Sequence, residues 1–210
     1  MSRNLVIALP KGRIQEESMK IFEKIGFGCE EMFSGSRKLI FHLPQQPVTF
    51  TIVRAQDVPT YVHHGAADIG ICGKDTLEES TCELYEPLDL GFGGCDVVVA
   101  EPEGFSRQHP GYNGTTIGTK MVNVAERFFA NKGVDVEIIK LYGSIELAPL
   151  VKLAHRVVDI VETGETLRQN GLVVKETIFH STCRVIVNRN SMKNRHRQIE
   201  SVLEQMHQQL

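Results

Sequence analysis

Short apolar runs alternate with amphipathic stretches along the whole chain. Leu5–Leu9 is an apolar run of strand length that ends at Pro10, and residues 13–25 carry apolar side chains at helical spacing before Gly26. The same order of strand and helix recurs toward the C-terminus. Strands that alternate with helices in this way predict an α/β fold.

The predicted elements fall into two groups. In the first half, strands are predicted at 38–43, 48–53, 68–72 and 83–90, with a helix from 57 to 63. In the second half, strands are predicted at 96–100, 115–118, 136–141, 157–161, 172–180 and 183–188, with helices at 122–131, 146–153 and 166–170 and a final helix around Ile199–Met206.

A glycine cluster, Gly91–Gly94, separates the two groups and is the best candidate hinge. We therefore expect two lobes, each with a central sheet: lobe I from residues 1–90 and 184–210, and lobe II from residues 91–183. The run through Cys183 would return the chain to lobe I for the last helix. Ligands of open α/β sheets bind at the carboxyl ends of strands, so an interlobe cleft is the expected site.

Composition narrows the class of protein. The 210 residues carry 23 basic and 26 acidic side chains, a net charge of −3, which does not suggest a nucleic-acid surface. Five scattered cysteines without a C-x-x-C pair favour neither disulfides nor zinc and fit a reducing cytoplasm. The apolar run at 5–9 is too short for a signal sequence or a membrane span.

Residues 157–172 have the pattern of a buried strand that breaks into an anion-binding turn. Gly164 can adopt a positive φ, and the hydroxyls of Thr163 and Thr166 add donors beside the start of a helix. Asp159 and Glu162 could accept hydrogen bonds from sugar hydroxyls, so a phosphorylated sugar would fit. The same pattern is also that of an ordinary strand-to-helix connection with a threonine N-cap, and this segment alone does not distinguish the two.

Cations follow several of the other predicted strands. Each one taken singly is more often a solvated surface charge, but their repeated position at strand ends would suit a polyphosphate ligand. These residues are Lys11, Arg13, Arg54, Lys74 beside Asp75, and Lys120.

Two further features of the sequence bear on which kinds of functional site are expected. Glu146 begins a predicted helix after the 136–141 strand, where it is either a capping carboxylate or a ligand-binding group. The eight histidines have no metal-binding spacing, and no G-x-S-x-G, Walker A or Rossmann glycine motif is present. The sequence therefore indicates neither a protein-bound metal nor a hydrolase nucleophile.

Several blocks of the chain resemble the ATP phosphoribosyltransferases of histidine biosynthesis, in the family's order and spacing. They are Ala8–Ile14, Arg54–Val62, Gly65–Asp75, Ile138–Pro149 and Val158–Leu167. The resemblance implies a two-lobed fold of the type II periplasmic-binding-protein kind. It also implies transfer of a 5-phosphoribosyl group from phosphoribosyl pyrophosphate to N1 of ATP, with Mg²⁺ on the pyrophosphate.

Residue roles carried over by motif place phosphoribosyl pyrophosphate in lobe II and ATP in lobe I. The substrate-binding set implied by the resemblance is Asp75, Lys120, Glu146, Asp159, Glu162, Thr163, Gly164, Glu165, Thr166 and Leu167. Lys11, Arg13 and Arg54 would take the catalytic role, facing ATP and pyrophosphate.

The length resembles the short form of the family, which lacks a C-terminal regulatory domain. The resemblance then implies a homodimer of this chain and a hetero-octamer with a regulatory subunit related to histidyl-tRNA synthetase, which would confer inhibition by histidine. Two other functions are compatible with the pattern: a non-catalytic binding protein of the same two-lobed fold, and a phosphoribosyltransferase that acts on another base.

Overall fold

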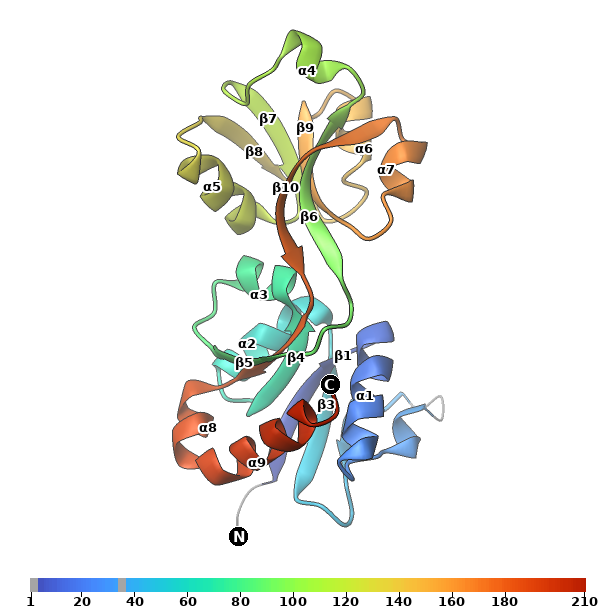
Figure 1. Ribbon diagram of the computed structural model, residues 1–210, viewed down its shortest axis with the longest axis vertical. Helices are drawn as coiled ribbons and strands as arrows, with labels where there is room; N and C mark the ends of the chain where they lie inside the picture. Colours follow the sequence, from blue (N-terminus) through green and yellow to red (C-terminus); the bar gives the residue numbers. More distant parts are fainter. Residues whose placement is uncertain (1–3, 34–36) are drawn as a thin grey trace. The chain divides into compact units, whose positions relative to one another are not determined.

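The computed structural model describes residues 4–33 and 37–210 and divides the chain into two compact units (Figure 1). Unit 1 is Met1–Gly93 with Thr182–Leu210, and unit 2 is Gly94–Ser181. These limits differ by two or three residues from the predicted lobe boundaries. The reason is backbone pairing: the N–H of Leu90 donates to the carbonyl of Cys183 (2.9 Å), and the N–H of Cys183 donates to that of Phe92 (2.9 Å), which keeps 90–92 in unit 1.

Unit 1 is built on a mixed sheet with the order β2-β3-β1-β4-β11-β5, in which β3, β1 and β4 are parallel. Its strands are β1 (Leu5–Pro10), β2 (Ile40–His42), β3 (Val48–Val53), β4 (Ile69–Gly73), β5 (Tyr85–Asp89) and β11 (Cys183–Val187). Its helices are α1 (Arg13–Lys24), α2 (Val58–His63), α3 (Lys74–Ser80), α8 (Arg189–Asn194) and α9 (His196–His207), with 3₁₀ turns at Glu30–Phe33 and Ala55–Asp57.

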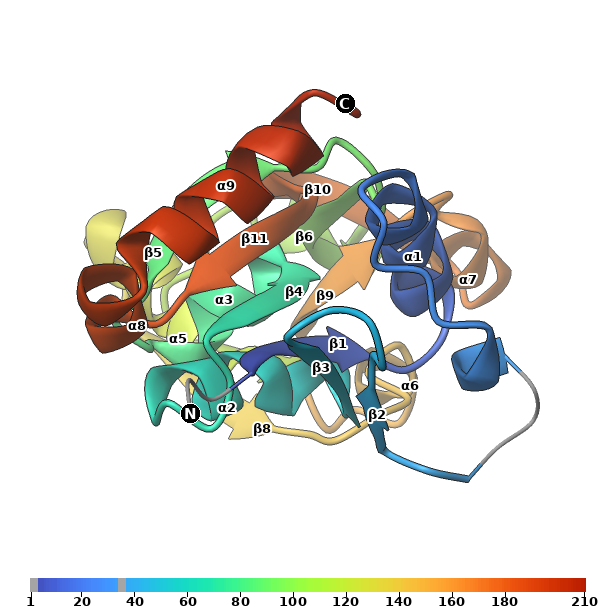
Figure 2. The same ribbon diagram turned by 90° about the horizontal axis from the view of Figure 1, so that it is seen from below.

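Both faces of the unit 1 sheet are covered by helices (Figure 2). Helices α1 and α9 pack on one face, where Phe22 meets Phe50 edge to face with ring centroids 5.1 Å apart. Helices α2 and α3 cover the other face. A Cβ at Gly70 would lie 2.7 Å from Val62 and 2.8 Å from Val58, so glycine at this position lets α2 approach β4 closely.

Unit 2 has a five-stranded sheet with the order β10-β6-β9-β7-β8, in which β9, β7 and β8 are parallel. Its strands are β6 (Cys95–Pro102), β7 (Thr115–Thr119), β8 (Val136–Lys140), β9 (Arg156–Val161) and β10 (Leu172–Ser181). Its helices are α4 (Phe105–Gln108), α5 (Val122–Asn131), α6 (Leu147–Leu150) and α7 (Glu165–Gln169). Helix α5 packs on one face, and α6 and α7 on the other.

A buried arginine organises the connection between β6 and β7 in unit 2. Arg156 has no exposed surface; its Nε donates to Glu101 (2.7 Å), and its other nitrogens donate to the carbonyls of His109 (2.6 Å) and Gly111 (2.8 Å). The guanidinium also lies over the ring of Tyr112, 5.0 Å from its centroid. Because these contacts are all made to the 101–112 segment, and a further bond goes to the Thr115 hydroxyl on β7 (3.4 Å), this one side chain fixes that connection to β9.

Several predicted element boundaries were wrong. The predicted 146–153 helix ends at Leu150, because Lys152 adopts a left-handed conformation (φ 59°) that stops it. The predicted 38–43 strand is limited to β2, Ile40–His42. Asp57 does not cap a helix with its side chain, since a 3₁₀ turn precedes α2. The sequence pattern did not predict α4, α8 or the 3₁₀ turn at Glu30–Phe33.

Two buried polar residues attach the returning C-terminal segment to unit 1. The Asn188 side chain accepts from the N–H groups of the first turn of α8 and donates to the carbonyls of Val62 (2.7 Å) and His63 (3.0 Å). The Asp68 carboxylate accepts from the Val6 N–H (2.8 Å) and the Ser191 hydroxyl (2.7 Å), and Arg195 lies 3.4 Å away. The bonds from Asn188 to Val62 and His63, and from Ser191 and Arg195 to Asp68, join residues more than 100 positions apart in sequence.

Asp68→Asn should destabilise unit 1. It removes the charge from a carboxylate that is 2% exposed and places an amide where three donors converge, so the free energy of unfolding should fall by about 2 kcal/mol. Chemical denaturation measures this fall. Glu83→Gln is the matched control, because Glu83 pairs with Arg189 at the surface and should change stability by less than about 0.5 kcal/mol. Equal effects of the two changes would contradict the role assigned to Asp68.

Candidate functional site

In unit 2, the connections that carry the predicted site residues leave the same edge of the sheet. Strands β7, β8 and β9 are parallel, so Lys120, the 141–146 segment and the 162–167 segment all follow carboxyl ends of strands. The Lys120 Nζ lies 3.5 Å from Asp159 Oδ1. The fold thus brings Lys120 and Asp159 together, although 39 positions separate them in the chain.

The pKa of the Asp159 carboxyl group is subject to opposing influences. Burial raises its pKa and outweighs Lys120 and the Ile160 N–H (2.8 Å), both of which lower it, while nearby Glu146 raises it further. A buried carboxylate with an adjacent cation and a second carboxylate can accept hydrogen bonds from ligand hydroxyls. The structure therefore groups Asp159, Glu146 and Lys120.

The 162–167 turn leads from β9 into α7 through a glycine in the left-handed conformation. Gly164 has a positive φ of 75° and is the N-cap of α7, so the alternative of a threonine N-cap was wrong. The N–H groups in the first turn of a helix have no carbonyl four residues earlier inside that helix. The Glu165 N–H donates to Thr163 Oγ1 (3.4 Å), and the Thr166 hydroxyl has no hydrogen bond within the described part of the chain.

Two members of the predicted set can offer only their backbone. The Glu165 carboxylate accepts from Arg168 (2.5 Å) and Gln169 (3.0 Å), and these contacts hold its pKa below the ordinary value. Leu167 is 4% exposed and belongs to the core beneath α7. Glu162, in contrast, is exposed next to the turn.

Unit 1 repeats the same arrangement. Lys11 and Arg13 follow β1, Arg54 follows β3, and Asp75 follows β4, so all lie beyond the carboxyl ends of parallel strands. Gly12 has φ 104° and ψ −150°, a conformation essentially restricted to glycine, and it is the N-cap of α1. Glycine at this position therefore directs the turn that presents Lys11 and Arg13.

Asp75 lies very close to the end of β4. A Cβ on Gly73 would stand 2.1 Å from Asp75 Oδ1, so the missing side chain at Gly73 leaves room for this carboxylate. Lys74, predicted as one of the ligand-facing cations, instead bonds Glu86 (2.6 Å) and Glu78 (3.0 Å). Burial alone would lower the pKa of Lys74, but these carboxylates raise it. The charge of Lys74 is therefore balanced within unit 1.

A cavity of about 410 Å³ opens beside Lys11. Its basic lining also includes Arg37 and Lys38, which sequence reasoning missed. Lys38 pairs with Glu31, whereas Arg37 has no ion pair with the described residues. The adjacent Arg-Lys pair was a signal, but it lies at the start of a predicted strand, and only the fold brings it to Lys11. The cavity suits an anionic group.

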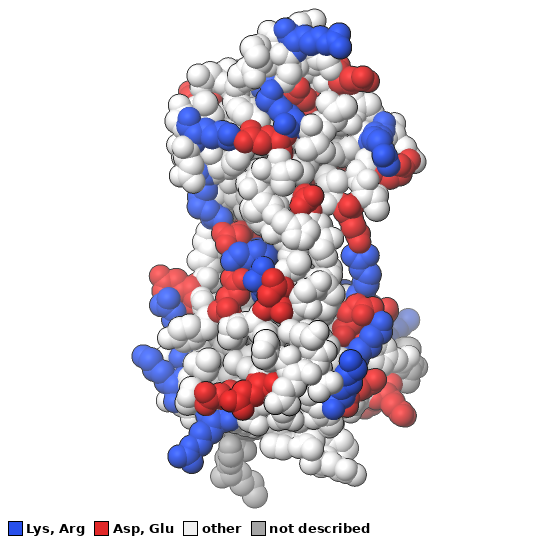
Figure 3. All heavy atoms as spheres, viewed as in Figure 1, with Lys and Arg blue, Asp and Glu red and all other residues white. Residues whose placement is uncertain are grey.

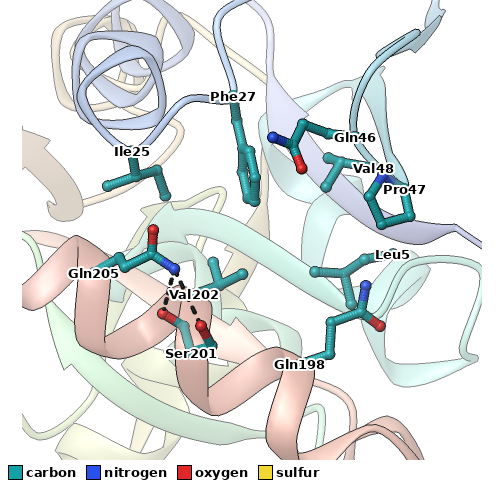
Figure 4. Close-up of a pocket in the computed structure, with 10 residues that line it drawn as sticks. All are labelled: Leu5, Ile25, Phe27, Gln46, Pro47, Val48, Gln198, Ser201, Val202 and Gln205. Atoms are coloured by element: carbon teal, nitrogen blue, oxygen red, sulfur yellow. Dashed lines mark hydrogen bonds between the residues drawn. The ribbon is translucent and has the colours of Figure 1, made fainter.

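A second cavity in unit 1, of about 290 Å³, lies at the opposite ends of the parallel strands (Figure 4). It includes Leu5 and Val48, the first residues of β1 and β3, and glutamines from α9, of which Gln205 bonds Ser201 through its side chain (3.1 Å). Among the described residues, no charged side chain lines it. This cavity is therefore a poor match for phosphates.

Basic and acidic side chains are interspersed over the face of the molecule in Figure 3. Within residues 4–33 and 37–210, no three His, Cys, Asp or Glu side chains gather as a metal-holding group. No helix in this part of the chain is both long and apolar enough to cross a membrane.

Comparisons with known proteins agree on one family. The sequence model of ATP phosphoribosyltransferase matches residues 54–208. The chain is 58% identical to an ATP phosphoribosyltransferase of Geobacter metallireducens, covering 97% of both chains, and 49% identical to one of Clostridium kluyveri, covering 99% of this chain and 94% of that one.

Solved structures give the same result. The chain is similar to the ATP phosphoribosyl transferase (HisG:HisZ) complex of Thermotoga maritima, with 35% identity, a TM-score of 0.83 and 97% coverage of both chains. The alkanesulfonate-binding protein SsuA of Xanthomonas axonopodis shares the fold alone, at 12% identity and a TM-score of 0.55, covering 99% of this chain and 73% of that one. These findings confirm the predicted two-lobed α/β fold.

Asp159→Asn should raise the melting temperature near neutral pH. Because burial raises the folded-state pKa of Asp159, ionisation costs more free energy in the folded than in the unfolded chain. The stability of the fold therefore falls as the pH rises from the unfolded-state pKa of Asp159 to its folded-state pKa. The asparagine side chain does not ionise, so the stability of this variant should not show that decrease with pH. Thermal unfolding across a pH series measures it.

Glu165→Gln is the control with the opposite sign. The pKa of Glu165 is lowered by Arg168 and Gln169, so its contribution is present above the ordinary glutamate pKa and disappears as pH falls. This variant should gain no stability at neutral pH. A lower melting temperature for Asp159→Asn would show that its charge stabilises the fold.

Proposed function

This chain belongs to the ATP phosphoribosyltransferase family, and on that basis we propose how its own residues carry out the reaction. The enzyme catalyses the first step of histidine biosynthesis: N1 of ATP attacks C1 of the ribose of phosphoribosyl pyrophosphate. The N1–C1 bond forms, the C1–O bond breaks, and pyrophosphate leaves with the electron pair. The non-catalytic alternative is disfavoured, because relatives across the whole length are transferases.

Unit 2 binds the phosphoribosyl donor in this proposal. The observation that supports it best is the turn from Glu162 to Leu167, where Gly164 with its positive φ begins α7 and the Thr166 hydroxyl has no hydrogen bond with a described residue. Such an arrangement suits the 5-phosphate. Glu165 and Leu167 take part through their backbone N–H groups.

The ribose lies next to the carboxylates. Asp159 and Glu146 accept from the ribose hydroxyls, and Lys120, 3.5 Å from Asp159, balances their charge and reaches the donor's phosphates. Holding the ribose rigidly matters because the transition state resembles an oxocarbenium ion that forms only when attacking and leaving groups are aligned. Such alignment is worth roughly 7–11 kcal/mol in model reactions.

Unit 1 binds ATP and stabilises the departing pyrophosphate. Lys11, Arg13 and Arg54 supply positive charge, with Arg37 as an additional cation in the cavity beside Lys11. Adenine N1 carries a free lone pair, so no general base is required. The pyrophosphate brings a divalent ion, Mg²⁺, as part of the substrate, and this ion neutralises charge as the C1–O bond breaks.

We also propose the short-form assembly for this chain. The Thermotoga maritima relative was solved as a HisG:HisZ complex and covers the same length. By the same arrangement, this chain would form a homodimer and then a hetero-octamer with a subunit related to histidyl-tRNA synthetase, in the cytoplasm. That subunit would carry inhibition by histidine.

The activity is tested with the chain and its regulatory subunit together. Incubation with ATP, Mg²⁺ and phosphoribosyl pyrophosphate should release pyrophosphate and change the ultraviolet absorbance as N1-substituted adenine forms. A panel of other bases in place of ATP should give no product. Absence of product from a complex shown to be assembled would contradict the function. Product formed with another base would show that ATP is not the specific acceptor.

The turn is tested with the double variant Thr163→Ala/Thr166→Ala. Each hydrogen bond lost to a charged phosphate is worth about 1.5–3 kcal/mol, so KM for phosphoribosyl pyrophosphate should rise about tenfold or more, while KM for ATP changes little. Steady-state kinetics with each substrate varied measures this. Thr177→Ala, an exposed threonine on β10, is the control. Equal increases in both KM values would mean that the turn does not bind the donor.

A further inference from the structure

The connection after β8 has an unusual order of residues. Ser144 adopts a left-handed backbone conformation, with φ 49°, which residues with a Cβ seldom occupy. Its neighbour Gly143, the residue suited to that conformation, lies outside the left-handed region, and a Cβ on it would meet nothing within 4 Å. The backbone therefore gives a reason for neither the serine at 144 nor the glycine at 143.

The other left-handed residues with side chains have an ordinary explanation. Thr81 is the C-cap of α3, and Lys152 follows the C-terminus of α6, positions where a left-handed residue commonly ends a helix. Ser144 instead precedes α6. It does not cap that helix through its side chain, because the N-cap is Glu146 and no N–H of a described residue donates to the Ser144 hydroxyl.

The Ser144 side chain has no task within the fold. Its carbonyl accepts from the Leu147 N–H (3.2 Å), so the backbone serves the turn. Its hydroxyl is exposed and makes no hydrogen bond with any described residue. The turn follows a strand parallel to β7 and leaves the sheet edge where Lys120 and Asp159 pair, two residues before Glu146.

We propose that Ser144 binds the phosphoribosyl donor through its hydroxyl, and that Gly143 leaves the space through which the donor approaches this turn. The inference rests on the proposed function and adds a residue that the family motif did not assign. The Ser144 hydroxyl can donate a hydrogen bond to the anionic oxygens of phosphoribosyl pyrophosphate, while Asp159 and Glu146 accept hydrogen bonds from the ribose hydroxyls. Holding this serine in a left-handed conformation fixes the direction of its Cβ.

Two substitutions separate the hydroxyl from the backbone. Ser144→Ala removes the hydroxyl and keeps the left-handed strain, whereas Ser144→Gly removes both. In the complex with the regulatory subunit, both variants should raise KM for phosphoribosyl pyrophosphate about tenfold or more and leave KM for ATP nearly unchanged. The melting temperature of Ser144→Gly should not fall. Lys152→Gly relieves a similar left-handed residue (φ 59°) near the same helix and should keep normal kinetics.

Calorimetric titration of each variant complex with phosphoribosyl pyrophosphate and Mg²⁺ gives the same comparison without turnover. Wild-type affinity in both Ser144 variants would overturn the proposal, and so would a loss confined to one of them, since that would indicate a backbone effect. Failure of the proposed function has a different signature, because the unmodified complex would then form no product.

Discussion

In each unit, three parallel strands end at one edge of a sheet, and the connections that follow them carry the candidate site residues. Parallel pairing requires each strand to be followed by a crossover, and here the crossovers include helices that cover both faces of the sheet. Residues separated by tens of positions therefore reach the same edge. The buried strands make this geometry rigid, and the connections are free to differ in chemistry.

The discontinuous chain path depends on a small number of buried polar contacts. Unit 1 is complete only when 182–210 returns to it, inserting β11 between β4 and β5 and placing α9 on the core. Asp68 and Asn188 supply the hydrogen bonds that fix this return. Arg156 plays a comparable part in unit 2 by satisfying carbonyls of a long connection. The buried side chains of Asp68, Asn188 and Arg156 each have hydrogen-bond partners, as an apolar interior requires.

The cations of the candidate site divide by what they contact. Lys74 is held by two carboxylates, and Lys38 pairs with Glu31, so their charges are balanced within unit 1. Lys11 and Arg37 line a cavity and have no ion pair with described residues. Lys120 is intermediate between these cases, because its Nζ lies 3.5 Å from Asp159 Oδ1 while its side chain remains one-third exposed. A strand-end cation is thus a weak signal until its neighbours are known.

The sequence by itself determined the alternation of strands and helices, the break near Gly91–Gly94 and the glycine turn at Gly164 before α7, because periodicity and glycine conformation are local properties. It also carried the family motifs, which the comparisons confirm. Only the tertiary structure decided that Lys74 is internally paired, that Arg37 joins Lys11 at a cavity, and that Asp159 is buried beside Glu146. The same holds for Ser144, whose conformation depends on how β8 leads into α6. Burial and ion pairing depend on neighbours that are distant in sequence, so no local pattern could have fixed them.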